Sequence, residues 1–210
     1  ALPAGGKVRY ELFRGGGASF PRVEIAKDAK KLEIRWAGKQ VLRYHQGVVP
    51  PPPGKSPLYA RSAFVHPLWS PAGQVLTCIH PADHLHHMGL WNPWTKTLYK
   101  GRHVDFWNLK SGQGTVRFDR FLLLEEGPVY ARFQARHLHV VAPGRPDEEV
   151  ALREVFDLRV FAVPGVRVEA LYRARQRRPV NAGFFRQFPE AVGAGQQAAV
   201  EPGPGQPFIL

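Results

Sequence analysis

The feature that most constrains the fold of this chain is a strict alternation of side-chain character in its second half. In residues 129–139 the odd positions carry small, aromatic and imidazole side chains, whereas the even positions are largely polar. Successive side chains of a strand point to opposite faces of a sheet, so a period of two indicates a strand with one buried face. The pattern predicts long strands at 115–124, 130–141 and 150–163.

Turn-forming residues separate the predicted strands at hairpin-length intervals. Ala-Gly-Lys-Gln at 37–40 joins two short strands, and Glu-Glu-Gly-Pro at 125–128 joins two long ones. Further strands are expected at 74–79, with Cys78 buried, and at 104–109. Because no segment shows the 3.6-residue apolar period of an amphipathic helix, we expect an all-β antiparallel sandwich with few or no helices.

The length of 210 residues suits one domain with a sizeable core. We place the β-sandwich domain at residues 1–165. Residues 166–210 are rich in Arg, Ala, Gly, Pro and Gln, a composition that buries too little apolar surface to order itself. Two origins are open for this segment: a natural disordered tail, or a truncated or out-of-frame end that replaces the last strands and leaves the sandwich incomplete at its C-terminal side.

Composition excludes several classes of protein. A single cysteine cannot form a disulfide framework or a Cys-rich metal module. No run approaches the roughly 18 apolar residues of a membrane-spanning helix, so we expect a soluble protein, cytoplasmic or exported after removal of a signal. The net charge of +12 comes from basic residues that mostly alternate with apolar ones, as on solvated strand faces, which disfavours a nucleic-acid partner.

Four of the nine histidines lie within eight residues, His80, His84, His86 and His87, with Asp83 among them. Imidazole changes charge near neutral pH and binds transition metals when neutral, and a neighbouring carboxylate orients it. We predict His84, His86 and Asp83 as catalytic residues, and His84, His86 and His87 as ligands of a divalent transition metal. An extended run places His84 and His86 on one side, whereas a helical turn places His84 and His87 on one face, so either geometry supplies two imidazoles.

Residues around this run supply a candidate substrate site. Trp91 and Trp107 offer indole faces of the kind that pack against the C–H faces of sugars. His66 and Asp105 lie on flanking strand-like segments, and we predict all four as substrate-binding residues. A third metal ligand would have to come from His66, His103 or Asp105.

A structural interpretation stands beside this functional one. Loop histidines bond backbone carbonyls, Asp83 is suited to capping a turn, and tryptophans near strand ends usually pack in cores. His137 and His139 share one face of a predicted strand, and we assign them to the surface or the core rather than to the site.

Three motifs make the sequence similar to a known family. They are His66-Pro-Leu-Trp-Ser-Pro-Ala-Gly73, Pro81-Ala-Asp-His-Leu-His-His-Met-Gly-Leu-Trp91 and Arg102-His-Val-Asp-Phe-Trp107. Over roughly residues 26–163 the chain resembles the bacterial family of uncharacterised proteins that carry the label methane oxygenase PmoA. The resemblance implies a soluble, β-rich protein with a sandwich like those of galactose mutarotases. It does not imply the membrane methane monooxygenase subunit of the same name, which is rich in transmembrane helices.

Three functions remain open at this point. The first, which we favour, is a carbohydrate-related enzyme in which His84 or His86 is a general base or metal ligand and Asp83 orients an imidazole. The second is a non-catalytic carbohydrate-binding module in which the tryptophans bind the sugar. The third is a metal-dependent oxygenase, as the family label suggests. The expected partner is a small molecule or carbohydrate.

Overall fold

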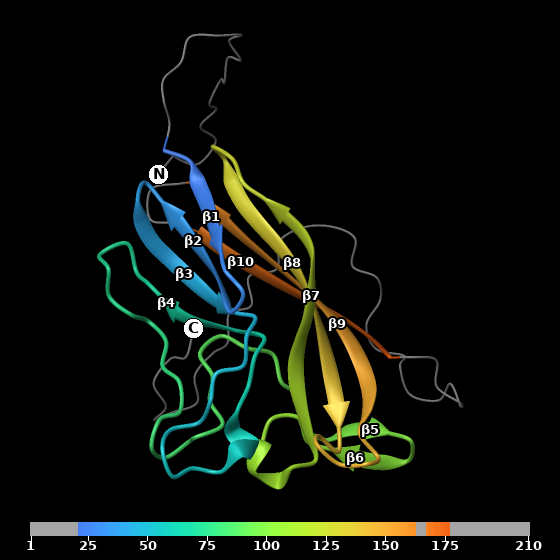
Figure 1. The fold of residues 1–210 in the computed structure, drawn as a ribbon. Helices are drawn as coiled ribbons and strands as arrows, with labels where there is room; N and C mark the ends of the chain where they lie inside the picture. The colour runs from blue at the N-terminus through green and yellow to red at the C-terminus, as the bar shows by residue number, and fades with distance from the viewer. Residues whose placement is uncertain (1–20, 163–166, 177–210) are drawn as a thin grey trace, which may run out of the picture.

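Two four-stranded antiparallel sheets make up most of the computed structural model, which describes residues 21–162 and 167–176 (Figure 1). The first sheet, in the order β1-β2-β3-β4, contains β1 (Val23–Lys27), β2 (Lys31–Trp36), β3 (Lys39–His45) and β4 (Phe64–Leu68). The second, in the order β10-β9-β8-β7, contains β7 (Gly114–Glu125), β8 (Tyr130–Val141), β9 (Glu149–Phe161) and β10 (Arg167–Gln176). A small hairpin pairs β5 (Thr97–Tyr99) with β6 (Arg102–Val104).

The described residues contain short 3₁₀ turns, η1 (Pro57–Tyr59) and η2 (Leu109–Ser111), and no α-helix. The prediction of an all-β antiparallel sandwich with few or no helices is therefore confirmed. Nor does any helix in the described part of the chain have the length and apolar character needed to cross a membrane.

The two sheets enclose the main hydrophobic core. Tyr44 of β3, Phe133 of β8 and Phe156 of β9 are at most 1% exposed. The ring centroid of Tyr44 lies 4.9 Å from that of Phe133 and 6.0 Å from that of Phe156. The sheets are also tied at one edge, where the Val23 N–H donates to the carbonyl of Gly127 (3.0 Å). Burial of these aromatic side chains is the main force that holds the sheets together.

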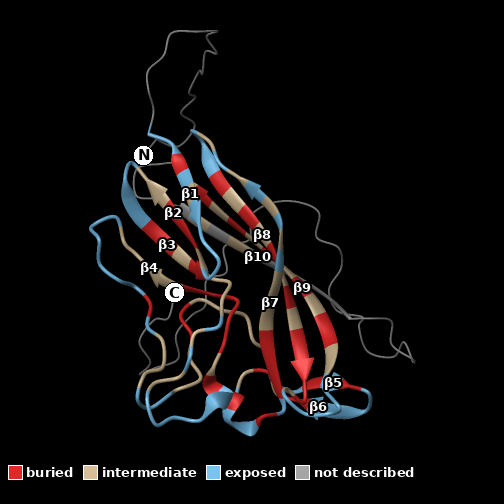
Figure 2. Cartoon of the chain, viewed as in Figure 1, coloured by how far each residue is buried: buried red, intermediate tan, exposed pale blue. Residues whose placement is uncertain are grey.

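Burial alternates along β8 and β9, as the period of two predicts (Figure 2). The buried phase of β8 begins with Ala131 and Phe133 and continues through Ala135 to His137 and His139. On β9 the buried phase includes Glu154, which pairs directly with His137 across the ladder. Two imidazoles and a carboxylate therefore replace apolar side chains on the inner face of the second sheet.

The predicted hairpins also form. β2 and β3 are joined by Ala37 and Gly38, whose φ angles of 50° and 75° suit the two-residue turn that matches the twist of adjoining strands. The turn at 125–128 connects β7 to β8.

Two expected strands are wrong in detail. In the described structure, residues 74–79 form only isolated bridges, Val75 with Trp69 and Ile79 with Met88, and no strand. The chain beyond residue 79 is an irregular loop and offers no continuous strand with which to pair. Cys78, expected to be buried, is exposed. The strand expected at 104–109 ends at Val104, because the Asp105 carboxylate accepts the N–H groups of Trp107 and Asn108 and turns the chain.

Strand β10 continues the second sheet past residue 165, where the sequence pattern places the end of the sandwich. It pairs with β9 along its length, and Val168 and Ala170 pack against the main core. The expected tail from residue 177 onward lies outside the described residues. The division into a sandwich and a tail stays a prediction.

Loops close one end of the molecule. There β7, β8 and β9 extend beyond the first sheet, and the β5–β6 hairpin lies at this end (Figure 1). Val104 and Phe106 are buried there against Val116 of β7 and Leu152 of β9, which makes a second hydrophobic core. Every predicted site residue except His66 belongs to residues 80–107, the segment that contributes to this core.

Candidate functional site

The histidine run folds into a closed loop held by its own backbone. The His80 N–H donates to the carbonyl of His87 (2.9 Å). Inside this closure the His84 N–H donates to Pro81 (3.0 Å) and the His87 N–H to His84 (2.9 Å). The run is thus two successive turns, rather than the extended strand or single helical turn considered from the sequence.

The two turns bring three imidazoles together, those of His84, His86 and His87, which we call the imidazole cluster. The ring centroid of His87 lies 4.8 Å from that of His84 and 4.7 Å from that of His86, and His84 and His86 are 5.8 Å apart. Either conformation considered from the sequence places only two of these imidazoles together. The turn from His84 to His87 brings all three together.

Asp83 contacts one member of the cluster. Its Oδ2 lies 2.9 Å from Nδ1 of His84, and both side chains are more than half exposed. The hydrogen bond from His84 lowers the pKa of Asp83. The carboxylate can therefore fix the orientation of this imidazole, while the catalytic assignment of both residues stays a prediction.

Two indoles adjoin the cluster. Trp91 and Trp107 have ring centroids 5.2 Å apart at an interplanar angle of 42°. The ring of Trp107 lies 6.3 Å from that of His86 and 5.8 Å from that of His87, and Trp91 lies 6.5 Å from His87. Residues that are 16 positions apart in the chain thus form one aromatic wall beside the imidazoles.

Asp105 holds Trp107 in this wall. Its Oδ1 accepts the N–H of Trp107 (2.8 Å) and of Asn108 (3.0 Å), and its Oδ2 accepts the Asn108 amide (2.6 Å). Burial raises the pKa of Asp105, but these hydrogen bonds outweigh burial, so the pKa is lowered and the group is a carboxylate. The substrate-binding role predicted for Asp105 stays a prediction, while its contacts show it orienting the loop.

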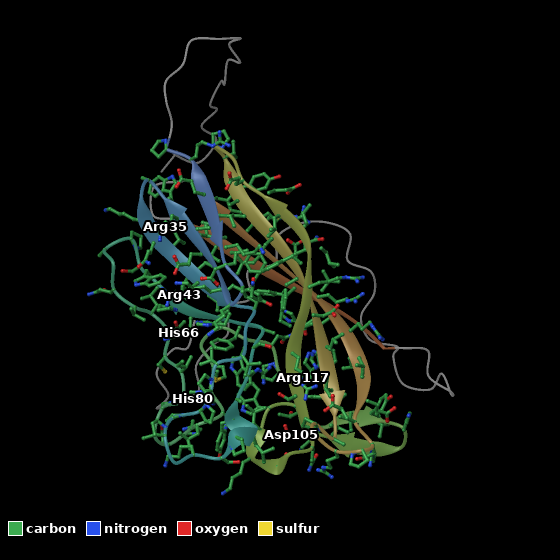
Figure 3. All side chains as sticks on the ribbon, viewed as in Figure 1. Arg35, Arg43, His66, His80, Asp105 and Arg117 are labelled. Carbon is green, nitrogen blue, oxygen red and sulfur yellow. The ribbon has the colours of Figure 1, made fainter. Side chains whose placement is uncertain are left out.

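His66 has different neighbours. Its Nδ1 lies 2.9 Å from Oγ1 of Thr77, and its backbone carbonyl is 2.7 Å from Nε2 of His45. Figure 3 shows His66 nearer the first sheet, with His80 and Asp105 toward the opposite end of the molecule. The ring contacts of the imidazole cluster found among the described residues do not include His66. Its role as a substrate-binding residue stays a prediction.

The cluster favours neutral imidazoles. Burial lowers the pKa of His86 and of His87, and the neighbouring imidazoles lower both further. Asp105 and Asp83 act in the opposite direction on His86 and His87, respectively, without reversing the shift. At neutral pH each of these rings therefore keeps one nitrogen lone pair, which can accept a proton or a hydrogen bond.

The donor atoms do not have the arrangement of a metal site. Within residues 21–162 and 167–176, no three His, Cys, Asp or Glu side chains are placed as ligands of one metal ion. The divalent-metal site predicted at His84, His86 and His87 stays a prediction, and no chemical step below relies on a metal.

A second group of ionisable side chains lies in the core. His137 Nδ1 and His139 Nε2 lie 2.9 and 3.1 Å from the two carboxylate oxygens of Glu154, and Tyr44 Oη lies 2.7 Å from His137 Nε2. Asn92 Nδ2 also donates to Glu154 (3.3 Å). We call these five residues the buried carboxylate network, since Glu154 and His139 are 1% and 0% exposed.

The network holds an ionised carboxylate. Burial raises the pKa of Glu154, but hydrogen bonds from His137 and His139 outweigh burial and lower the pKa to about 2. Burial lowers the pKa of His137, against the effect of Glu154. A neutral His137 that donates through Nδ1 to Glu154 accepts a hydrogen bond from the Tyr44 hydroxyl at Nε2, so each of its ring nitrogens has a partner.

Acidification is expected to destabilise the protein. Because the pKa of His137 is lower in the folded state, the unfolded chain binds an extra proton below pH 6.5, and the free energy of unfolding falls by at most about 1.4 kcal/mol per pH unit for that group. Glu154 adds a further loss as the pH falls from 4.5 toward its folded pKa of about 2. Urea unfolding at pH 8 to 4 measures the slope.

The His137→Gln variant should flatten this slope between pH 7 and 5. Part of the slope should remain, because burial also lowers the pKa of His45, His66, His86 and His87. His103→Gln, at an exposed position, serves as the control and should behave as the wild type. An unchanged slope in His137→Gln would show that this histidine is not the titrating group.

A separate hollow of about 570 Å³ lies beside the β2–β3 turn. Its lining includes Trp36, Trp69, Lys39, Gln40 and Ser70. None of the predicted site residues lines it, and it lacks the imidazoles and carboxylates needed for proton transfer. The imidazole cluster is therefore the better candidate for chemistry.

Residues 31–180, well over half of the chain, match the sequence profile of a family described as a family of unknown function, DUF6807. The chain belongs to the DUF6807 family. No curated protein and no solved structure matches it. Membership in DUF6807 confirms the prediction of an uncharacterised family. The label methane oxygenase and the likeness to mutarotases stay predictions.

The sequence analysis did not predict the buried carboxylate network of this DUF6807 chain. The sequence pattern predicts His137 and His139 at the surface or in the core, and the structure places both in the core. The signal that was available is Glu154, which occupies the apolar phase of β9 between Leu152 and Phe156. An acidic residue in that phase needs buried hydrogen-bond donors, and the two histidines opposite are the donors.

Proposed function

We propose that this chain is a carbohydrate-related enzyme that transfers a proton at a sugar hydroxyl through the imidazole cluster. One observation carries the proposal: the rings of His86 and His87 lie 6.3 and 5.8 Å from the indole of Trp107. A sugar ring that packs its C–H face on an indole projects hydroxyl groups at its edge, within reach of neighbouring imidazoles.

The three imidazoles support acid–base chemistry. His86 and His87 have lowered pKa values and are neutral at pH 7, as a general base must be. One ring takes the proton of the anomeric hydroxyl as the C1–O5 bond of the sugar breaks and C1=O1 forms. The imidazolium formed in this way gives the proton to O5, directly or through the neighbouring ring, whose centre lies 4.7 Å away. His84 takes part through Nε2, since its Nδ1 is directed to Asp83.

The indole wall supports sugar binding. Trp107 is oriented by Asp105, and Trp91 stands beside it at 5.2 Å. Offset aromatic surfaces of this kind bind the apolar face of a pyranose while leaving its hydroxyl groups free. The substrate class we propose is therefore an aldose or a short glycoside.

Substitution in the two halves of the site should separate catalysis from binding. Untagged protein is mixed with D-glucose, D-galactose, cellobiose or lactose, and proton NMR follows binding by saturation transfer and turnover by the anomeric signals. We expect His86→Ala to lower kcat at least about 100-fold with little change in KM. We expect Trp107→Ala to raise KM by about 10-fold.

The control is His103→Ala, which removes an exposed imidazole on β6 outside the cluster and should leave both constants unchanged. Turnover that survives His86→Ala intact, or the failure of all four sugars to bind, would overturn the proposal. Binding without turnover, lost in Trp107→Ala and retained in His86→Ala, would identify a non-catalytic carbohydrate-binding module instead. Elemental mass spectrometry of the same untagged protein, beside a His84→Ala and His86→Ala double variant, tests the metal-dependent alternative.

A further inference from the structure

We infer that Arg61 and Asn92 are positioning residues that fix the indole of Trp91: Arg61 stacks on the indole, and Asn92 ties the next residue to the buried carboxylate Glu154. Two chain neighbours are each held by a buried charged side chain: Trp91 by the guanidinium of Arg61 and Asn92 by the carboxylate of Glu154. For sugar binding the inference rests on the proposed function; for the position of the indole it stands alone.

Arg61 lies under Trp91. Its guanidinium carbon is 4.2 Å from the centre of the indole, and the residue is 2% exposed. A buried guanidinium stacked on an indole is a strong cation–π contact, because little water competes for the cation. Arg61 thus covers one face of Trp91, and a ligand can use only the opposite face.

Asn92 ties the next residue to the same region. Its side-chain amide donates to Oε2 of Glu154 across 3.3 Å, although the two residues are 62 positions apart. Glu154 is an ionised carboxylate in the core, so this hydrogen bond is charge-assisted.

The two attachments are on the same side of the loop, and a third lies just before them. Burial lowers the pKa of His137, and the charge of Arg61 adds to this shift, in keeping with a position of Arg61 near the ring that hydrogen-bonds Glu154. Leu90, just before Trp91, exchanges two backbone hydrogen bonds with Val65 of β4 (2.9 and 3.0 Å). Three consecutive residues are therefore anchored, at 90 by a strand, at 91 by a cation and at 92 by a carboxylate.

Such anchoring sets the shape of the site before a ligand arrives. A side chain that is already immobile loses little entropy on binding, so a fixed indole binds more tightly than a mobile one. Trp107 is fixed independently by the Asp105 turn. Arg61 and Asn92 therefore act on the Trp91 half of the wall.

Fluorine NMR of protein labelled with 5-fluorotryptophan tests this inference without a substrate. Trp91→Phe assigns the Trp91 resonance. We expect Asn92→Ala and Arg61→Lys each to broaden or split that resonance while thermal unfolding stays cooperative. The matched control is Gln134→Ala, which also removes an amide-to-carboxylate hydrogen bond (2.9 Å to Asp157) but on the outer face of β8, and should leave the resonance sharp.

A single, unshifted Trp91 resonance in the folded Asn92→Ala variant would overturn the inference, and that variant alone decides if Arg61→Lys does not fold. With the sugar that is turned over, Asn92→Ala should raise KM about fivefold at unchanged kcat. An equal fall in kcat would contradict a positioning role. If Asn92→Ala changes the Trp91 resonance but the wild-type protein binds none of the four sugars, this inference is supported and the proposed function is refuted.

Discussion

Replacement of Glu154 by alanine is expected to lower the free energy of unfolding by about 3–5 kcal/mol. The carboxylate receives hydrogen bonds from His137, His139 and Asn92, and the two histidines would be left in the core without this acceptor. Urea unfolding at pH 7 measures the change.

Glu149→Ala is the matched control, because it removes a glutamate from the same strand. Glu149 pairs with an exposed lysine, Lys100, so the urea midpoint of the Glu149→Ala variant should stay close to that of the wild type. A comparable loss in the two variants would mean that the effect comes from β9 itself rather than from the buried network. Glu154→Gln keeps a hydrogen-bond acceptor but not the charge, so its free energy of unfolding should lie between those of Glu154→Ala and Glu149→Ala.

Gly89→Ala is expected to destabilise the protein by about 2–4 kcal/mol and to displace the site. Gly89 has φ +66°, and an added Cβ would lie 2.3 Å from the carbonyl oxygen of Val65. The backbone would have to move away from β4, which breaks the pair of hydrogen bonds between Leu90 and Val65. Urea unfolding measures the loss of stability, and the Trp91 fluorine resonance reports the displacement.

Gly73→Ala isolates the contribution of the left-handed backbone. Gly73 has φ +85°, but a Cβ there meets nothing within 4 Å. We expect a loss of about 1–2 kcal/mol from conformation alone and no effect on Trp91. Equal losses in the two variants would show that the contact with Val65 does not matter.

The strands of the sandwich could be predicted because their pattern is local. Each alternating residue of β8 and β9 reports the face on which it lies, and the β2–β3 turn is marked by Ala37 and Gly38. The segment at 74–79 could not be predicted, because its apolar residues resemble a strand while its partner is a loop. The end of β6 could not be predicted either, since it depends on hydrogen bonds to the Asp105 side chain.

The density of histidines in residues 80–87 indicates the imidazole cluster, and Trp91 and Trp107, predicted as substrate-binding residues, lie beside it. The three imidazoles come together through two backbone turns, which cannot be predicted from the pattern of side chains. Arg61 is remote in sequence from both the cluster and Glu154, and only the packing of loop on sheet brings it beneath Trp91. Long-range electrostatic partners of this kind have no local signature.

The second hydrophobic core couples the stability of the protein to the position of the Trp107 indole. Phe106 is fully buried and stands in the chain between Asp105 and Trp107, so any change in the volume of that core shifts the turn that orients the indole. A substitution that changes the packing of Phe106 is therefore expected to change both the stability of the protein and the position of Trp107. Under the function proposed above, the choice of sugar would depend on residues beneath the aromatic wall as well as on the wall itself.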